Sequence, residues 1–457
     1  MTLSRAIVRR WMALDGREPP EPALQAARLH LLDAVGVGLA AASLEQGTPY
    51  RAFLAGRSGP VHALTGARSH DPAEVALVNG GLIHAIEYDD THTASIIHGS
   101  AVLAPTALAA AQARGAAPRA AISAYLLGYE ALIRMGLAAP GAFQARGFQV
   151  TSVAGALAAA LVAADIFGAN EDQRVHAMGI ALSQSSGVFE FLSNGSTVKS
   201  LHPGWAAHAG LIAARLAMAG MTGPQTALEG ARGLFASFAG EASASDRLAD
   251  LMEDFGARWR IEDVAFKFLP CCHYLHPFVE AAGELADQGV TPQRIRALVL
   301  RIAPGAASIV CEPWSAKLSP PDGHAARWSL PITVATRLVE GRVDHQTFRD
   351  APGEPVLALA ARCRYEALEP NHFPHAFEAE IKAHLTDGAI ANAGVTDVYG
   401  NATRPAARID VLAKFRANAG RLLDEAAAAA LEAFFLAPNA HDFAPFAAAL
   451  GTIKPEA

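Results

Sequence analysis

Residues 84–98 read His84-Ala-Ile-Glu-Tyr-Asp-Asp-Thr-His92, followed directly by Thr93-Ala-Ser-Ile-Ile-His98. This stretch holds three histidines and three carboxylates, although the sequence on both sides is apolar and rich in alanine. Charged groups placed in a dry interior need partners or a ligand, and titratable groups cluster at functional sites. Some of these carboxylates could cap the following helix, but capping does not explain the histidines. We therefore expect a functional site between two buried helices.

Helical patterns surround this stretch on both sides. Residues 72–79 carry apolar side chains at helical spacing, and residues 101–113 are small and apolar with one breaker, Pro105. The same reasoning predicts an all-helical domain with only a short extended piece at residues 61–65. Its further predicted helices are two amphipathic ones within residues 3–43, then 122–137, 153–167, 171–187 and 205–219, with more helix over 222–259 around a loop at 240–246.

The pattern changes near Pro270, where β-rich segments begin. Residues 296–302, 362–365 and 378–385 read as strands, the last ending in a turn at 386–388. Helices are predicted between them over 276–287 and 328–340, and again after about residue 403 over 409–415, 421–435 and 441–450. We predict a mainly α protein. A large all-helical domain is built from both chain ends, residues 1–268 and 401–457, and a smaller α/β lid domain comprises residues 269–400.

Composition narrows the class of protein. The chain has 457 residues and a net charge of -7, which argues against a nucleic-acid partner. Its four cysteines suggest no disulfide framework, and its first residues lack a long apolar segment, so we expect a cytoplasmic protein. The uncharged region 91–113 is interrupted by polar residues and Pro105, so we expect no membrane span. With 51% hydrophobic and 18% charged residues, we expect a homodimer with an apolar interface.

A second polar cluster lies in the glycine- and serine-rich segment 193–204. Lys199 and His202 are three residues apart, ahead of a helix predicted to begin near Trp205. The free N–H groups at the start of a helix suit an anion, and a lysine there can hold a carboxylate or transfer a proton. Taken alone, Lys199 would be read as a solvated loop residue.

A third cluster, Lys267, His273 and His276, lies where the two predicted domains join, and pockets often form at such junctions. The adjacent Cys271 and Cys272 are interpreted as buried structural thiols, since free cysteine behaves mostly as a small hydrophobe.

A fourth cluster precedes the helix predicted at 153–167. Arg146 and Gln149 could line a pocket, while Thr151 or Ser152 could equally cap the helix. The chain has no glycine-rich dinucleotide or phosphate-binding motif and no GxSxG nucleophile motif. The four clusters together fit acid–base chemistry on a small carboxylate substrate, with no organic cofactor. We also expect no metal, because the group of carboxylates and histidines has no second ligand set at a recognisable spacing.

Several motifs resemble signatures of the MmgE/PrpD family, in the family's order and over nearly the whole chain. They are His84-x-x-Glu-Tyr-Asp-Asp-Thr91, Gly195-x-x-x-Lys199-x-x-His202-x-Gly204, Lys267-x-x-Pro270-x-x-x-x-x-His276, and Arg327-Trp-Ser-Leu-Pro331 with Gly341. The family contains 2-methylcitrate dehydratases, cis-aconitate decarboxylases and iminodisuccinate epimerases. The resemblance implies a helical domain made from both chain ends, a smaller α/β lid and a homodimer.

The resemblance also implies roles for individual residues. It suggests catalytic roles for Glu87, which occupies the position of a usual aspartate, and for Thr91, His98 and Lys199. It also implies substrate binding by Lys267 and His276. From the polar clusters themselves, we expect Asp90, Arg146, Gln149 and His202 to bind substrate as well.

Two positions depart from the family pattern. Gln149 stands where dehydratases and decarboxylases often have a histidine, and Cys272 stands where a further histidine can occur. Glutamine cannot carry a proton between groups.

The predicted function is a cofactor-independent hydro-lyase acting on a small di- or tricarboxylate, similar to 2-methylcitrate dehydratase. A base would remove a proton next to a carboxylate, and cationic side chains would stabilise the negative charge that develops. The alternatives are an epimerase of the iminodisuccinate type, which need not expel a hydroxyl, and a cis-aconitate decarboxylase. A further alternative is a non-catalytic relative that binds a polycarboxylate.

Overall fold

The computed structural model describes residues 1–193, 195–437 and 441–453. The chain forms two compact units, a helical unit of Met1–Phe266 with Ala407–Ala457 and a mixed unit of Lys267–Ala406. Each unit has its own hydrophobic core. The prediction of a mainly α fold with a smaller region containing a sheet is confirmed. The borders fall at 266/267 and 406/407, where the sequence suggested 268/269 and 400/401.

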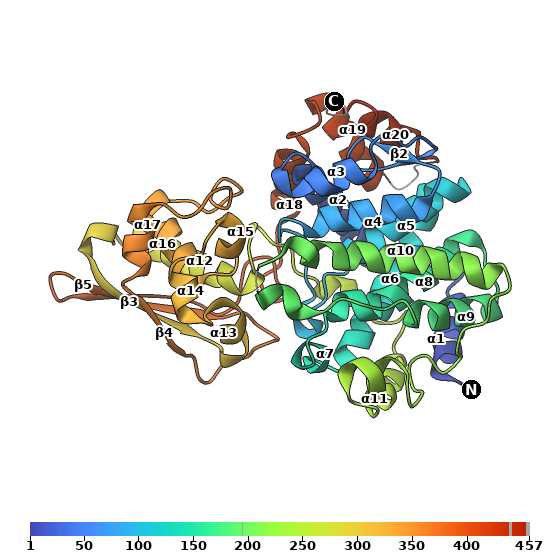
Figure 1. Ribbon diagram of the computed structural model, residues 1–457, viewed down its shortest axis with the longest axis horizontal. Coiled ribbons are helices and arrows are strands. Elements are labelled where there is room, and N and C mark those ends of the chain that lie inside the picture. Colours follow the sequence, from blue (N-terminus) through green and yellow to red (C-terminus); the bar gives the residue numbers. More distant parts are fainter. Residues whose placement is uncertain (194, 438–440, 454–457) are drawn as a thin grey trace. The chain divides into compact units, whose positions relative to one another are not determined.

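The centre of the helical unit is a layer of apolar helices. It consists of α4 (Pro72–His84), α5 (Ser100–Arg114), α8 (Val150–Phe167) and α10 (Leu201–Met218), and Figure 1 shows α10 running alongside α4 and α8. Small residues permit this close approach. A Cβ atom on Gly204 would lie 2.2 Å from the carbonyl oxygen of Leu77, and one on Gly210 would lie 2.4 Å from the Cβ of Ala159. The alanine-rich composition is therefore a packing requirement.

The C-terminal helices complete this unit, as the sequence predicted. A Cβ atom on Gly36 of α2 would lie 2.8 Å from the ring of Phe415 on α18, so the two chain ends pack tightly together. The remaining helices and strands of the unit are α1 (Leu3–Met12), α2 (Glu21–Ala42), α3 (Thr48–Phe53), β1 (Val61–His62), β2 (Arg68–Ser69), α6 (Pro118–Ala138), α7 (Ala142–Ala145), α9 (Glu171–Leu182), α11 (Ala244–Leu251), α18 (Arg408–Ala419), α19 (Glu425–Leu436) and α20 (Ala444–Leu450).

Four local predictions in the helical unit are wrong. The helix expected from Trp205 begins at Leu201, because Pro203 is tolerated in a first turn. Segment 222–259 holds only a π turn and the short α11, since glycines and a proline interrupt it. The predicted loop at 240–246 includes the start of α11, and the extended piece at 61–65 shrinks to the two residues of β1.

Helix α8 is long and apolar enough to cross a membrane, but 89% of its most apolar window is buried inside the structure. It packs as a core helix against α5, α6, α9 and α10. A second candidate, the pair Glu21–Ala42 and Glu45–Phe53, is bent by 96°.

The mixed unit is built on a four-stranded sheet in the order β4-β3-β5-β6. Strand β3 (Ile295–Ile302) pairs in parallel with β4 (Cys363–Ala367) and antiparallel with β5 (Ala379–Leu385), which pairs antiparallel with β6 (Ile390–Val395). Strand β6 was not predicted, because its alanine, asparagine and glycine residues have low strand propensity. The helices are α12 (His276–Asp287), α13 (Pro304–Val310), α14 (Trp314–Leu318), α15 (Gly323–Ala326), α16 (Leu330–Glu340) and α17 (Glu354–Ala360).

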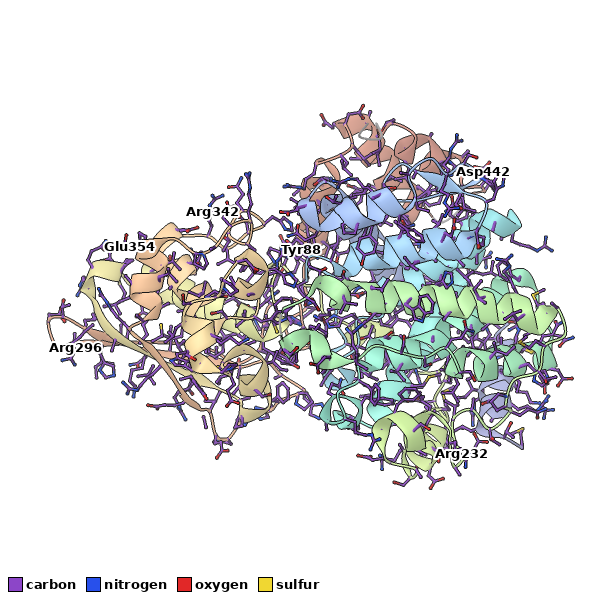
Figure 2. The ribbon with its side chains drawn as sticks, in the orientation of Figure 1. Tyr88, Arg232, Arg296, Arg342, Glu354 and Asp442 are labelled. Carbon is purple, nitrogen blue, oxygen red and sulfur yellow. The ribbon has the colours of Figure 1, made fainter. Side chains whose placement is uncertain are left out.

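Exposed charged side chains project from the surfaces of both units. Figure 2 labels Arg232 and Asp442 in the helical unit and Arg296, Arg342 and Glu354 in the mixed unit, all of them exposed. The charged groups of residues 84–98 are instead almost entirely buried, which sets them apart from ordinary surface charge.

Candidate active site

The stretch 84–98 is the connection between α4 and α5. Helix α4 ends at His84, and α5 begins at Ser100. Within the connection, Glu87 and Ile96 adopt left-handed backbone conformations with φ of 55° and 57°. Such conformations are unfavourable for side chains of this kind and concentrate at functional sites. The connection is therefore held in shape by its surroundings.

Asp89 joins the two histidines that flank this connection. Its Oδ2 lies 2.8 Å from Nδ1 of His84 and 3.7 Å from Nδ1 of His98. The Nδ1 atom of His98 also lies 3.0 Å from the carbonyl oxygen of Asp90 and 3.1 Å from Oγ1 of Thr91. A carbonyl oxygen only accepts, so Nδ1 of His98 carries a hydrogen. Neutral His98 then has its lone pair on Nε2, as a proton-transfer group requires.

The carboxylate of Asp90 contacts Ser100 and His30, not the two histidines that Asp89 contacts. Its Oδ1 accepts from the backbone N–H of Ser100 at 3.3 Å, its Oδ2 accepts from the Ser100 hydroxyl, and Nδ1 of His30 lies 2.9 Å from Oδ2. The Ser100 hydroxyl also meets the Tyr125 hydroxyl at 2.6 Å. Asp90 thus ties the connection to α2, α5 and α6. The substrate contact expected for Asp90 would have to compete with these bonds and stays a prediction.

Lys199 and Glu87 form an ion pair between residues 112 apart in the chain. Lys199 lies in a 3-10 turn, Thr197–Ser200, directly before α10. Their side chains are 13% and 5% exposed, respectively. The structure therefore brings together two residues that the sequence could only place in separate clusters. Asn194, part of the polar turn noted in the sequence, lies outside the described residues.

Gln149 connects His202 to His84, and through His84 to Asp89. The Oε1 atom of Gln149 lies 2.7 Å from Nδ1 of His202, and its Nε2 atom lies 3.2 Å from Nε2 of His84. Burial is the main cause that lowers the pKa of His202 to about 4, and the ammonium group of Lys199 lowers it further. His202 is therefore neutral at neutral pH, and its imidazole has an unprotonated nitrogen.

Helix α8 also supports the catalytic candidates directly. The Oγ1 atom of Thr151 accepts the backbone N–H of His98 at 3.1 Å. Ser152 donates to the carbonyl oxygen of His202 at 2.8 Å. The first turn of α8 therefore positions both His98 and His202. The hydroxyl groups of Thr151 and Ser152 make these contacts instead of capping the helix.

Three of the predicted site residues have contacts of their own. Arg146 is exposed and donates to the carbonyl oxygen of Ser237 at 3.3 Å, so it turns toward the π turn. Lys267 and His276 belong to the mixed unit, where both are buried, and Nε2 of His276 lies 3.3 Å from the carbonyl oxygen of Cys271. Their substrate-binding roles stay predictions.

The structure adds a residue that no local pattern indicated. Lys414 of α18 is buried, and its Nζ donates to the carbonyl oxygen of Tyr88 at 2.9 Å and to Asp33 at 2.8 Å. The same Nζ lies 4.1 Å from the centre of the Tyr88 ring. Since Tyr88 follows Glu87 directly, the C-terminal segment holds the site connection in place. His84 and Asp89 stood in the quoted stretch, but no local spacing predicted that they would pair.

His84, Asp89 and His98 could in principle hold a cation, since one ligand atom of each lies within 4.8 Å of the others. In the structure, however, the Nδ1 atoms of both histidines are used as hydrogen-bond donors. A metal bound through these Nδ1 atoms would have to displace those protons. The expected absence of a metal remains a prediction to be tested.

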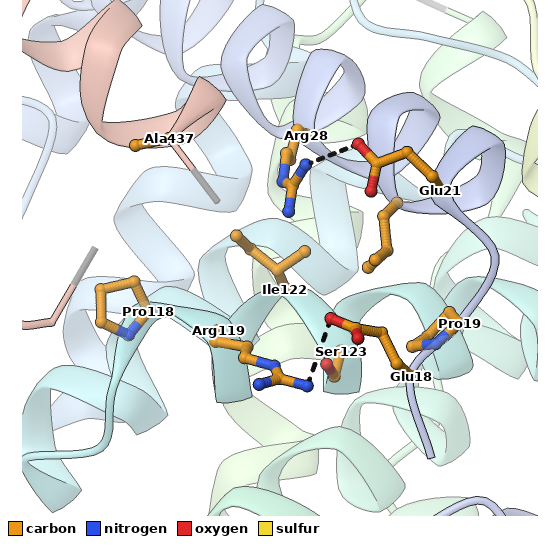
Figure 3. Close-up of a pocket in the computed structure, with 10 residues that line it drawn as sticks. Glu18, Pro19, Glu21, Arg28, Pro118, Arg119, Ile122, Ser123 and Ala437 are labelled. Atoms are coloured by element: carbon orange, nitrogen blue, oxygen red, sulfur yellow. Dashed lines mark hydrogen bonds and ion pairs between the residues drawn. The ribbon is translucent and has the colours of Figure 1, made fainter. Parts of the chain in front are cut away.

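A surface pocket of the helical unit contains none of these residues. Figure 3 shows Arg28 beside Glu21 and Arg119 beside Glu18, with ion-pair distances of 3.2 Å and 3.4 Å. Each cation in the pocket is matched by a carboxylate, so it offers no net attraction to an anion.

Comparison with known proteins agrees with the motifs. The MmgE/PrpD N-terminal domain matches residues 6–246, and the MmgE/PrpD C-terminal domain matches residues 269–437. Cis-aconitate decarboxylase of Homo sapiens is 29% identical over 77% of this chain and 73% of its own length. The enzyme of the same name from Mus musculus is 28% identical over 86% and 82%. That from Aspergillus terreus is 25% identical over 78% and 76%. With both domains matched in order, this chain belongs to the MmgE/PrpD family.

Proposed function

We propose that this protein is a carboxy-lyase that removes carbon dioxide from cis-aconitate or a closely related unsaturated tricarboxylate, without a cofactor. The observation that carries this proposal is the nearly buried ion pair between Lys199 and Glu87, a residue on the same connection as His98. The relatives described above are named cis-aconitate decarboxylases. They favour decarboxylation over the dehydration predicted first.

The proposed reaction needs a proton donor and cationic groups. The bond to the departing carboxylate breaks, and its electron pair forms a new double bond to the central carbon. The original double bond shifts its electron pair to the far carbon, which takes a proton from an acid, and carbon dioxide leaves. A preorganised cation beside the developing negative charge accelerates such a step. No electrons are exchanged with an external group.

The residues of the helical unit can supply these functions. Lys199 is the proposed proton donor or charge stabiliser, and Glu87, its partner, would return the proton. His98 is the alternative acid, held in one tautomer by the carbonyl oxygen of Asp90 and accompanied by Thr91. Lys267 and His276, which belong to the mixed unit, are proposed to hold the carboxylates that stay on the product. We place this reaction in the cytoplasm, in a homodimer.

Gln149 bears on the choice between reactions. Dehydration must protonate a departing hydroxyl, and an amide cannot supply that proton, so Gln149 argues against dehydration. Decarboxylases also often have a histidine at this position, so the preference for decarboxylation comes from the named relatives and not from Gln149. Epimerisation stays the second candidate, since it expels no hydroxyl.

One experiment separates these candidates. Proton NMR in deuterated water, with a panel including cis-aconitate, 2-methylcitrate and iminodisuccinate, distinguishes carbon dioxide loss, dehydration and exchange at the α carbon. We expect cis-aconitate to lose carbon dioxide and to gain one deuterium at carbon. Dehydration of 2-methylcitrate or exchange without bond cleavage would refute the proposal in favour of the corresponding alternative. Binding of a polycarboxylate without turnover would indicate the non-catalytic relative.

A further inference from the structure

Four side chains of the helical unit form one continuous chain of hydrogen bonds. They run from Asp89 to His84 at 2.8 Å, from His84 to Gln149 at 3.2 Å, and from Gln149 to His202 at 2.7 Å. All four are at least nine-tenths buried. They come from α4, the connection after it, the residue before α8, and the first turn of α10.

The chemistry of each group sets the direction of this chain. The Asp89 carboxylate accepts, so Nδ1 of His84 donates. In the neutral ring the other nitrogen of His84, Nε2, then accepts. The Gln149 amide nitrogen must therefore face His84, which turns the amide oxygen toward His202. That oxygen only accepts, so Nδ1 of His202 carries the hydrogen. The lone pair of His202 is then on Nε2.

We propose that His202 takes up a proton when a polycarboxylate binds, and that Gln149, oriented by His84 and Asp89, positions His202 to do so. The inference rests on the proposed function only in taking a polycarboxylate as the ligand. With Nδ1–H already bonded to an oxygen, protonation at Nε2 creates an imidazolium whose second N–H can donate to a ligand carboxylate. The proton comes from solvent.

The surroundings of His202 favour this coupling. The titratable groups that face it are Lys199, from the turn before α10, and His84, from α4. Lys199 is paired with the carboxylate of Glu87, and His84 is paired with that of Asp89.

Among the described residues of the helical unit, the other elements packed against His202 contribute uncharged groups. Helix α8 contributes uncharged Gln149 and Ser152, and the turn Phe189–Ser193 contributes the ring of Phe191. Helices α5 and α9 also pack against α10, and neither supplies a charge that acts on His202.

A ligand with several negative charges would change the pKa of His202. In the free protein, burial is the main cause that lowers the pKa of His202 to about 4. Ligand carboxylates would raise it, because an opposite charge favours the imidazolium. Gln149 is central because it offers His202 a neutral acceptor. A carboxylate in the place of Gln149 would stabilise protonated His202, so His202 would already carry the proton before a ligand bound.

The test measures proton uptake on binding of tricarballylate, a saturated tricarboxylate that cannot lose carbon dioxide by the proposed route. Calorimetry in phosphate and in Tris at pH 7 gives the number of protons taken up, and we expect about one per site. The Kd should also rise about tenfold per pH unit between pH 6.5 and 7.5. Absence of binding, or binding without proton uptake, in the wild-type protein would overturn the inference.

Three variants test whether His202 is the group that takes up the proton. His202→Gln should bind more weakly and take up none. Gln149→Glu should also take up little, because its carboxylate protonates His202 in the free protein. His208→Gln, on the same helix and stacked on Trp205, should behave as wild type. Uptake retained in His202→Gln would assign the proton to another group and overturn the inference. Since tricarballylate is not turned over, failure of decarboxylation is a separate result.

Discussion

Replacement of Lys199 by methionine tests the site most directly. The change removes the ammonium group while keeping an unbranched side chain, and leaves Glu87, 4% exposed, without its cation. Breaking a buried ion pair from one side costs about 3–5 kcal/mol. Because the Lys199 side chain keeps 13% exposure, we expect the lower end, a loss of about 3 kcal/mol in the free energy of unfolding. Loss of a preorganised charge should also lower kcat about 10²-fold.

Two measurements and a second variant separate these effects. Urea unfolding gives stability, and carbon dioxide release from cis-aconitate gives kcat and KM. In the double variant Lys199→Met/Glu87→Gln no unpaired charge remains, so stability should recover to within about 1 kcal/mol of wild type. The value of kcat should stay low, because the cation is still absent. A loss seen only in KM would mean that Lys199 anchors the ground state.

Lys199→Arg provides the matched control. Arginine keeps the positive charge but does not release a proton in the working pH range. Wild-type turnover in this variant would show that Lys199 acts by charge alone, and proton transfer would pass to His98 or Glu87. Unchanged kcat and unchanged stability in Lys199→Met would refute the reasoning altogether.

Further predictions concern pH, the C-terminal segment, metal and assembly. His202 has its pKa lowered to about 4 in the folded state, so the unfolded chain binds its proton first as pH falls. The free energy of unfolding should therefore decrease between about pH 6.5 and 4, by at most about 3 kcal/mol more than in His202→Gln; parallel curves for both proteins would contradict this. Lys414→Met and Asp33→Asn should each cost about 3 kcal/mol in urea unfolding, and the double variant much less, because each single change leaves a buried charge unpaired. Activity should survive EDTA, whereas activity lost with EDTA and restored by one divalent metal would overturn the expectation of metal-free catalysis. Light scattering at micromolar concentration should show a homodimer, and a stable monomer would exclude it.

Local patterns in the sequence determined most of the secondary structure. The helix predicted over 276–287 is α12, and the predicted strand 296–302 lies within β3. Apolar spacing and β-branched runs act within a few residues, so they can be read without knowing the fold. Where they are weak, prediction failed. Strand β6 exists because β5 offers it a hydrogen-bonding edge, not because of its own alanine and glycine residues.

The clustering of titratable residues in 84–98 was likewise visible in the sequence, and so were the family motifs. The partners of those residues were not. The Lys199–Glu87 pair, the bridge from Gln149 to two histidines, and the contact of Lys414 with Tyr88 join positions 112, 65, 53 and 326 residues apart. No local propensity encodes such contacts, because they depend on how closely α4, α8 and α10 approach. Burial of that helix layer decides which charges lose their water and must find each other, and only the tertiary structure specifies that burial.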